Sequence, residues 1–340
     1  MTDTPSGAGA LASEAVLRWA RQMGLAAGIS EERRLAAMRL DVLAGRALPR
    51  GGTADVELTA HWAAFVCWVD DQIDRRGLGS VPGELERFTT SLRRVLTCDA
   101  ATSAADAPQA VVLAWLWERT AAGMSDRWRK RFTADYRDFL DACEEEVAAR
   151  RSGTRLPLAD YVELRRRTIT LLPMLNVLER TGHAHLVEDP LVDAQLRDLR
   201  WALADVAGWA NDLASQVQDA AAGQDNLVSL IARRDDCPTD QARARVAAMI
   251  EQRRAEFRAT ALALRTTPTL PQPQLRELRR YVDLVETFMA ATLHWLASTG
   301  RFALDDEPAH RSQEPAAADA LRTDPPRRQP GTDGEWSGLG

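Results

Sequence analysis

Apolar residues recur along most of this chain with the spacing of amphipathic α-helices. Prolines, glycines and helix-starting residues divide the pattern into about a dozen segments with short links. We expect helices over residues 11–26, 30–44, 54–76, 82–98, 109–122, 125–150, 158–180, 190–222, 226–234, 239–266 and 274–297. A single all-α domain over residues 11–303 is the simplest architecture for this pattern. Residues 1–10 and 304–340 are polar with few aliphatic side chains, which predicts disordered ends.

Composition narrows the class of protein further. The net charge of −6 gives no reason to expect a nucleic-acid partner or a basic membrane-binding face. No apolar run reaches the roughly 18 residues of a membrane span, and the N-terminus lacks the pattern of a secretory signal. The four cysteines are far apart and show no metal-ligand spacing. These features predict an intracellular, cytoplasmic chain whose cysteines remain reduced.

Three aspartates follow an apolar, aromatic run in the helix expected over residues 54–76. Asp70 and Asp74 share one helix face because they are four residues apart, and Asp71 lies beside that face. Like charges this close destabilise a helix unless cations or solvent compensate them. Mg²⁺ prefers oxygen ligands and often binds through one or two carboxylates plus substrate phosphates. The motif alone therefore leaves two interpretations open, a Mg²⁺ site and a solvated helix end.

A second polar stripe lies on the helix expected over residues 190–222. Asn211, Ser215 and Asp219 recur every four residues and offer an amide, a hydroxyl and a carboxylate oxygen. Ala204 and Gly208 precede them near the same face and are small. An exposed face would normally carry Lys, Glu and Arg, so this stripe indicates a second set of ligands for a hard cation.

The two stripes together resemble the metal motifs of class I terpene synthases of the bacterial type. Asp70-Asp71-x-x-Asp74 matches the family's Asp-rich motif. Asn211, Ser215 and Asp219 match its NSE motif, with Asp in place of the usual Glu. The resemblance implies a single-domain class I terpenoid synthase helical bundle with the active site in the bundle core. It also implies three Mg²⁺ ions, held by Asp70, Asp74, Asn211, Ser215 and Asp219.

Arginines at two further positions extend the resemblance. Arg165 lies 46 residues before Asn211 (211 − 165 = 46), where the family has its diphosphate-sensing arginine, and it follows Tyr161. Trp295 and Arg301 keep the spacing of the family's C-terminal motif, although Phe302 replaces its tyrosine. The resemblance implies that Arg165 and Arg301 bind the diphosphate and that the carbonyl of Ile169 helps to trigger its ionisation. The other substrate-binding candidates are Arg166, Phe302, Phe65, Trp62, Trp209 and Gly208.

The resulting prediction is a Mg²⁺-dependent terpene cyclase that ionises a linear prenyl diphosphate and releases diphosphate. Farnesyl diphosphate is the favoured substrate and geranylgeranyl diphosphate the next. A chain-elongating prenyltransferase would carry a second Asp-rich motif where this chain has Asn211, Ser215 and Asp219. A non-catalytic helical scaffold would require all these matches to be coincidental. Pro173 is the expected cause of any helix break near Ile169. Family members are often dimers, which leaves a homodimer open.

Overall fold

The computed structural model describes residues 7–74, 77–81, 83–97, 107–266 and 270–302. All regular elements in these ranges are helical, which confirms the predicted all-α fold. They are α1 (Gly7–Gln22), α2 (Ile29–Ala37), α3 (Leu40–Ala47), α4 (Thr53–Asp74), the 3₁₀ helix η1 (Leu78–Ser80), α5 (Glu84–Thr97), α6 (Pro108–Ala121), α7 (Asp126–Ser152), α8 (Leu158–Thr168), α9 (Leu171–Thr181), α10 (Asp193–Ala221), α11 (Leu227–Arg234), α12 (Thr239–Arg265) and α13 (Gln272–Ser298).

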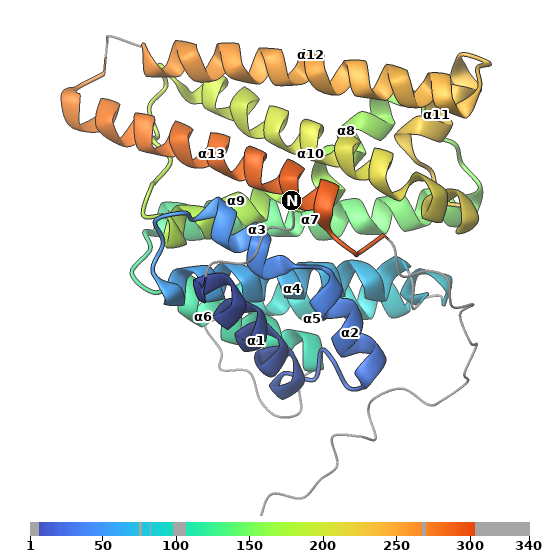
Figure 1. Cartoon of the computed structure of the whole chain (residues 1–340), viewed down its shortest axis with the longest axis horizontal. Coiled ribbons are helices and arrows are strands. Elements are labelled where there is room, and N and C mark those ends of the chain that lie inside the picture. Colours follow the sequence, from blue (N-terminus) through green and yellow to red (C-terminus); the bar gives the residue numbers. More distant parts are fainter. Residues whose placement is uncertain (1–6, 75–76, 82, 98–106, 267–269, 303–340) are drawn as a thin grey trace, which may run out of the picture. The chain divides into compact units, whose positions relative to one another are not determined.

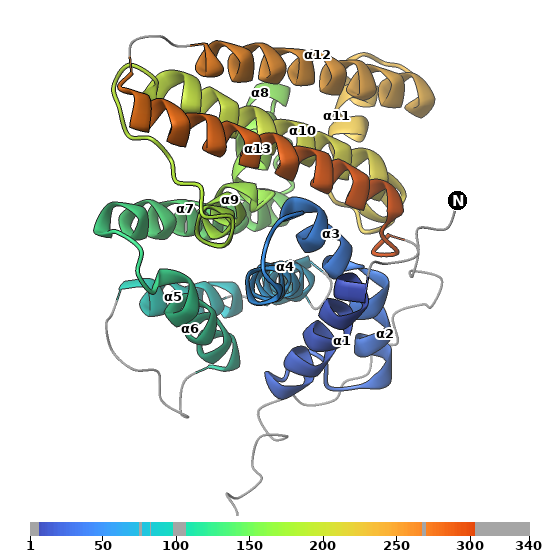
Figure 2. The same cartoon turned by 60° about the vertical axis from the view of Figure 1, so that its left-hand side comes forward.

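Two long helices, α4 and α10, organise the packing of the others. Helix α4 contacts α1, α3, α6 and α9, whereas α10 contacts α8, α11, α12 and α13. Figures 1 and 2 show α10, α12 and α13 running side by side, with α7 and α9 between this group and α4. Phe65 and Val69 on α4, and Leu203 and Val206 on α10, are fully buried. The ends of α4 and α10 carry the two predicted metal motifs.

The first departure from the predicted helices is a break at Met38 and Arg39. The sequence predicts one helix over residues 30–44, but α2 ends at Ala37 and α3 begins at Leu40. Arg39 adopts a left-handed conformation with φ of 54°, which a helix cannot accommodate. The break leaves the carbonyl of Met38 to accept hydrogen bonds from Trp295 Nε1 at 2.5 Å and Thr299 Oγ1 at 3.0 Å. A tertiary contact with the end of α13 thus replaces a helical bond.

The second departure divides the helix expected over residues 158–180. Helix α8 ends at Thr168 and α9 begins at Leu171, with Thr170 in the left-handed region at φ of 64°. The break predicted near Ile169 is present, and Pro173 accounts for it, because in a continuous helix the proline would lack the N–H for the Ile169 carbonyl and its ring would clash with that carbonyl. Pro173 is the third residue of α9, where a helix has no internal acceptor for the missing N–H. The break therefore lies at Ile169 and Thr170, which separates the ends of the two helices beside α10.

Several other predicted boundaries shift or lie outside the described residues. Helix α1 begins at Gly7, within the segment expected to be disordered, and Glu84 begins α5. Residues 1–6 and 303–340, and most of the link between the helices expected over residues 82–98 and 109–122, lie outside the described ranges. Within those ranges, no helix is both long enough and apolar enough to cross a membrane.

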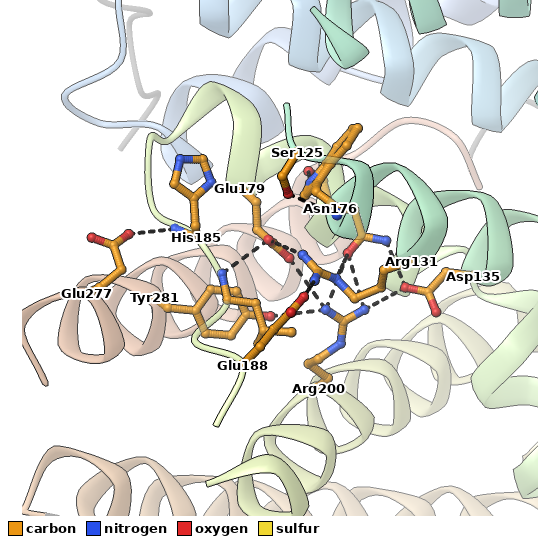
Figure 3. Close-up of polar contacts among 12 residues, drawn as sticks. Ser125, Arg131, Asp135, Asn176, Glu179, His185, Glu188, Arg200, Glu277 and Tyr281 are labelled. Carbon is orange, nitrogen blue, oxygen red and sulfur yellow. Dashed lines mark hydrogen bonds and ion pairs between the residues drawn. The ribbon is translucent and has the colours of Figure 1, made fainter. Parts of the chain in front are cut away.

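A buried ionic network joins α7, α9, α10 and α13 (Figure 3). Glu179 on α9 is fully buried and pairs with Arg131 of α7 and with Arg200 of α10. Nη1 of Arg200 also donates to the hydroxyl of Tyr281 on α13 at 3.3 Å, and Nη2 lies 2.6 Å from Asp135. Buried charges require such partners because burial removes their hydration. This network fixes four helices relative to one another.

Candidate active site

The Asp-rich motif occupies the last two turns of α4 and engages the C-terminal arginine. Nη2 of Arg301 lies 2.6 Å from Oδ2 of Asp70 and 3.0 Å from Oδ1 of Asp71. The Arg301 side chain is mostly buried. Its pKa is lowered by burial but raised more by Cys67, Asp71 and Asp70, so the net pKa is above its ordinary value. The structure therefore brings together the first predicted metal motif and Arg301, which are 231 residues apart.

Asp74 faces α7 and not Arg301. Its Oδ1 lies 3.0 Å from Nη2 of Arg150. Burial and the charge of Asp70 raise the pKa of Asp74 to about 6, although Arg150 and Arg165 oppose this shift. Glu146 lies one turn before Arg150 on α7, and burial and the charge of Asp74 raise its pKa to about 7. The Asp-rich motif thus belongs to a site whose negative charge Arg150 neutralises only in part.

The NSE-like motif is fixed to α8 by Arg165. Nε of Arg165 donates to Asp212 at 2.8 Å, and Nη2 donates to the side-chain oxygen of Asn211 at 2.6 Å. The buried carboxylate of Asp212 also accepts from Tyr161 Oη at 2.7 Å and from the Leu227 backbone N–H at 3.1 Å. Asp212 therefore orients Arg165 and Tyr161 at the same time, a role that the sequence analysis did not assign.

Ser215 and Asp219 form the C-terminal part of the same motif on α10. The Ser215 hydroxyl donates to Oδ2 of Asp219 at 2.6 Å, and Asn226 Nδ2 donates to the same oxygen at 2.6 Å. Burial raises the pKa of Asp219, and the hydrogen bonds from Ser215 and Asn226 oppose the increase. Asn211, Ser215 and Asp219 therefore lie along one face of α10, as their spacing predicts, and Asn226 joins them from the start of α11.

Arg165 connects the two motifs electrostatically. Burial lowers its pKa, but Asp212, Tyr161, Glu146 and Asp219 raise it, and the net pKa is above the ordinary value. Arg165 in turn lowers the pKa of Asp74 on α4. A single guanidinium therefore interacts with carboxylates from both motifs, which indicates that α4 and α10 contribute to one site.

Gly208 explains how α8 comes so close to α10. A Cβ atom at this position would lie 3.3 Å from Cγ of Arg165 and 3.8 Å from Cβ of Ile169. A side chain at residue 208 would force Arg165 to shift by a few tenths of an ångström, so glycine favours the close approach of Arg165 to α10. Ile169 stands at the end of α8, and no described residue donates a hydrogen bond to its carbonyl.

The last turn of α13 and the residues after it hold Arg301 in place. The Trp295 indole N–H donates to the carbonyl of Met38, and Gly300 N–H donates to the carbonyl of Ala37 at 2.9 Å. A Cβ at Gly300 would lie 3.0 Å from that Ala37 oxygen, so only glycine fits without a shift. Gln218 Nε2 donates to the carbonyl of Phe302. Gln218 on α10 therefore binds the backbone of Phe302, which stands where the resemblance implies a tyrosine.

Not every predicted site residue lies beside these motifs. Arg166 forms a bidentate pair with the buried Asp205, at 2.7 and 3.1 Å, and its guanidinium lies 5.0 Å from the ring of Trp201. The structure therefore directs Arg166 to Asp205 and brings only Arg165 to Asn211. Trp62 is enclosed in the core, and its Nε1 donates to Thr120 of α6 at 2.7 Å.

The other two predicted aromatic residues are also buried. Phe65 stacks on Trp68 with ring centroids 6.2 Å apart. The Trp209 indole N–H finds no hydrogen-bond partner within the described part of the chain. Core packing accounts for Phe65, and the role of both residues toward a substrate stays a prediction.

Sequence reasoning missed Arg150, Glu146 and Asn226. Arg150 and Glu146 lie in a segment of α7 crowded with charged residues, so no pattern distinguishes them from a solvated face. Asn226 immediately precedes an apolar helix, which is a recognisable helix-capping signal. Capping alone does not predict that the same amide contacts Asp219.

The donors at this site fit a hard divalent cation. Asp70, Asp74, Asn211, Ser215 and Asp219 supply only oxygen atoms, which such cations prefer. Within the described ranges, no three His, Cys, Asp or Glu side chains are placed to hold an ion by themselves. Mg²⁺ does not need such a cage, because it binds through few carboxylates together with phosphate oxygens. The raised pKa of Asp74 is consistent with acidic charge that a cation would stabilise.

The all-α fold and the two oxygen-rich motifs are those expected of a class I terpene synthase. Comparison with known proteins identifies the family. The family model described as terpene synthase family 2, C-terminal metal binding, matches residues 61–256. The chain therefore belongs to the terpene synthase family, and it is an enzyme of that metal-binding class.

Individual relatives match over most of the chain. Pristinol synthase of Streptomyces pristinaespiralis is 31% identical over 86% of this chain and 80% of its own length. A (−)-β-caryophyllene synthase of Saccharothrix espanaensis is 30% identical over 85% and 83%. The linalool/nerolidol synthase of Streptomyces clavuligerus, solved with 2-fluorogeranyl diphosphate, superposes with a TM-score of 0.77. It is 26% identical, and the match covers 86% of this chain and all of that chain. These matches confirm the predicted fold and enzyme class.

Proposed function

We propose that this terpene synthase is a Mg²⁺-dependent cyclase of a linear prenyl diphosphate, with farnesyl diphosphate as its favoured substrate. The observation that carries the proposal is Arg165, which binds Asn211 and interacts with carboxylates of both oxygen-rich motifs. The name of the Saccharothrix relative specifies cyclisation of (2E,6E)-farnesyl diphosphate. Geranylgeranyl diphosphate is the next candidate. The site holds carboxylates, which suit Mg²⁺, beside arginines, which suit diphosphate. It therefore favours binding the two ions together over either one alone.

Each polar residue has a distinct part in the proposed reaction. Asp70, Asp74, Asn211, Ser215 and Asp219 would hold Mg²⁺, which neutralises charge on the leaving diphosphate when bound. Arg165 keeps Nε on Asp212 and Nη2 on Asn211, and the remaining N–H groups of its two Nη nitrogens would donate to the diphosphate. Arg301 supplies a second guanidinium from the C-terminal side. The carbonyl of Ile169, which accepts no hydrogen bond from a described residue, would help to trigger ionisation of the diphosphate.

Product analysis tests the proposal directly. Purified protein is incubated with Mg²⁺ and geranyl, farnesyl or geranylgeranyl diphosphate, and the extracts are separated by gas chromatography. We expect a cyclic C15 hydrocarbon or alcohol from farnesyl diphosphate and no product once a chelator removes Mg²⁺. Longer linear diphosphates, formed only when isopentenyl diphosphate is added, would instead identify a prenyltransferase. No terpene from any of the three substrates would overturn the proposal.

The pKa values of Asp74 and Glu146 predict how Mg²⁺ binding depends on pH. Both are acids whose folded-state pKa, about 6 and about 7, exceeds the ordinary value. The unfolded chain loses these protons near pH 4 and the folded chain only near pH 6 to 7, so the metal-free fold loses stability between about pH 4 and pH 7, and Mg²⁺ offsets that loss. We expect Mg²⁺ to raise the melting temperature at about pH 8 but hardly at about pH 5, where both acids are protonated. At about ten times its Kd, the ion would stabilise the fold by roughly 1.4 kcal/mol.

Thermal melts in MgCl₂, and in NaCl of equal ionic strength, measure this effect. The Asp74→Asn variant is the control, because it lacks the more acidic of the two titrating groups and should show a smaller pH-dependent gain. An equal Mg²⁺ effect at both pH values would contradict the assignment of Asp74 to the cation site.

A further inference from the structure

Asn226 is a buried side chain that links the start of α11 to α10. It is 1% exposed and is the N-cap residue of α11. Its Oδ1 accepts from the Val228 N–H at 2.9 Å, and its own N–H donates to Ser229 Oγ at 3.3 Å. These contacts form a capping box, which satisfies backbone donors at the helix start. They use the oxygen of the Asn226 amide and leave its NH₂ group for other partners.

That NH₂ group binds α10 at two points. Nδ2 donates to the carbonyl of Asp212 at 2.9 Å and to Oδ2 of Asp219 at 2.6 Å. Ser215 donates to the same Oδ2 at 2.6 Å. Two donors therefore hold one oxygen of Asp219, whereas no described residue donates to Oδ1. A carboxylate held in this way has little freedom to rotate.

We propose that Asn226 is a positioning residue for the cation site and that it presents Oδ1 of Asp219 to Mg²⁺. This inference rests on the proposed function, because Asp219 acts there as a ligand. Aspartate is one methylene shorter than glutamate, so its reach depends strongly on the orientation of its carboxylate. Hydrogen-bond partners behind a ligand set that orientation and commonly alter metal affinity about 10- to 100-fold when removed. Asn226 donates its hydrogen bond to Asp219 from the N-cap of α11, outside the helix that carries Asn211, Ser215 and Asp219.

A simpler explanation is that Asn226 only caps α11, and matched variants separate the two roles. Serine caps a helix about as well as asparagine, but its hydroxyl is too short to keep both the cap and the contact with Asp219. Asn226→Asp keeps the size and the cap acceptor but places a second carboxylate against Asp219. Ser229→Ala removes one half of the capping box and leaves the contact with Asp219 unchanged.

Calorimetric titration of the full-length protein with Mg²⁺ and inorganic diphosphate provides a readout that does not require turnover. We expect the wild type to bind, Asn226→Ser to bind about 10- to 100-fold more weakly, and Asn226→Asp to bind more weakly still. Ser229→Ala should bind within about twofold of the wild type. Circular dichroism establishes that each variant is folded, and Asn226→Asp carries the test if Asn226→Ser does not fold.

The possible results separate the positioning role of Asn226 from the proposed Mg²⁺-dependent function. Wild-type affinity in a folded Asn226→Ser or Asn226→Asp protein would overturn the positioning role and leave the proposed function intact. Equal weakening by Ser229→Ala would overturn it too, because capping alone would then explain the loss. If the wild type itself fails to bind Mg²⁺ with diphosphate, the proposed function fails, and this inference fails with it.

Discussion

Replacing Asp70 with asparagine is expected to lower kcat/KM by about 100- to 1000-fold with little change in stability. Asparagine has nearly the same shape and keeps one oxygen acceptor for Arg301, so the change removes mainly the negative charge. That charge is what a Mg²⁺ ligand in the proposed site must supply. The Asp70 side chain is 52% exposed, and Asp71 also binds Arg301. We therefore expect the free energy of unfolding to change by less than about 0.5 kcal/mol.

Asp138→Asn is the matched control for this experiment. The Asp138 side chain is 49% exposed and lies 2.8 Å from Arg167, so it also is a half-exposed aspartate with an arginine partner. It lies on α7 and takes no part in the contacts of either motif. Its kcat/KM should remain within roughly twofold of the wild type. A similar loss in both variants, or near-normal activity in Asp70→Asn, would contradict the metal assignment.

The largest expected effect on stability follows from replacing Glu179 with glutamine. Glu179 is fully buried, and its carboxylate accepts from Arg131, from Arg200 and from the Leu186 N–H (Figure 3). Glutamine removes the charge and turns one acceptor into an NH₂ donor that faces other donors. Breaking a buried ion pair costs about 3–5 kcal/mol, because the remaining charges lose their compensation. The melting temperature should fall by roughly 4–8 °C.

Glu188→Gln serves as the control for the buried network. Glu188 lies 3.1 Å from the same Arg131, but its side chain is 31% exposed. Partly solvated pairs contribute little, so we expect a loss below about 1 kcal/mol. Thermal and denaturant unfolding measure both variants. If the two substitutions destabilise the protein equally, burial of Glu179 does not determine the strength of the network.

The sequence predicts the helical fold well because the apolar spacing of helices is a local signal. It does not predict the break at Arg39, which adopts a left-handed conformation that is unusual outside glycine, whereas Pro173 is a local signal for the break at Thr170. At the Arg39 break the carbonyl of Met38 accepts a hydrogen bond from the Trp295 indole N–H. In a continuous helix this carbonyl would accept from a backbone N–H one turn later. A local pattern cannot contain a partner that lies 257 residues away.

The site shows the same division between local and distant information. Spacing alone places Asn211, Ser215 and Asp219 on one face, and the structure has them there. Spacing does not reveal which helix faces them, so the contacts of Asn226 and Arg150 could not be predicted. For Arg165 and Arg166, adjacent in sequence, only the position of Asp205 and Asp212 on α10 shows which guanidinium reaches Asn211.

The contact between Met38 and the end of α13 has a consequence for the order in which the site forms during synthesis. The family model covers residues 61–256, so it includes both oxygen-rich motifs but neither Met38 nor Arg301. Helices α2 and α3 leave the ribosome before either motif, whereas Trp295, Gly300 and Arg301 emerge after both. Because Arg301 follows both metal motifs in the chain, the site is completed only after both motifs have been synthesised. A nascent chain that stops before Trp295 would contain both metal motifs yet lack the arginine beside Asp70.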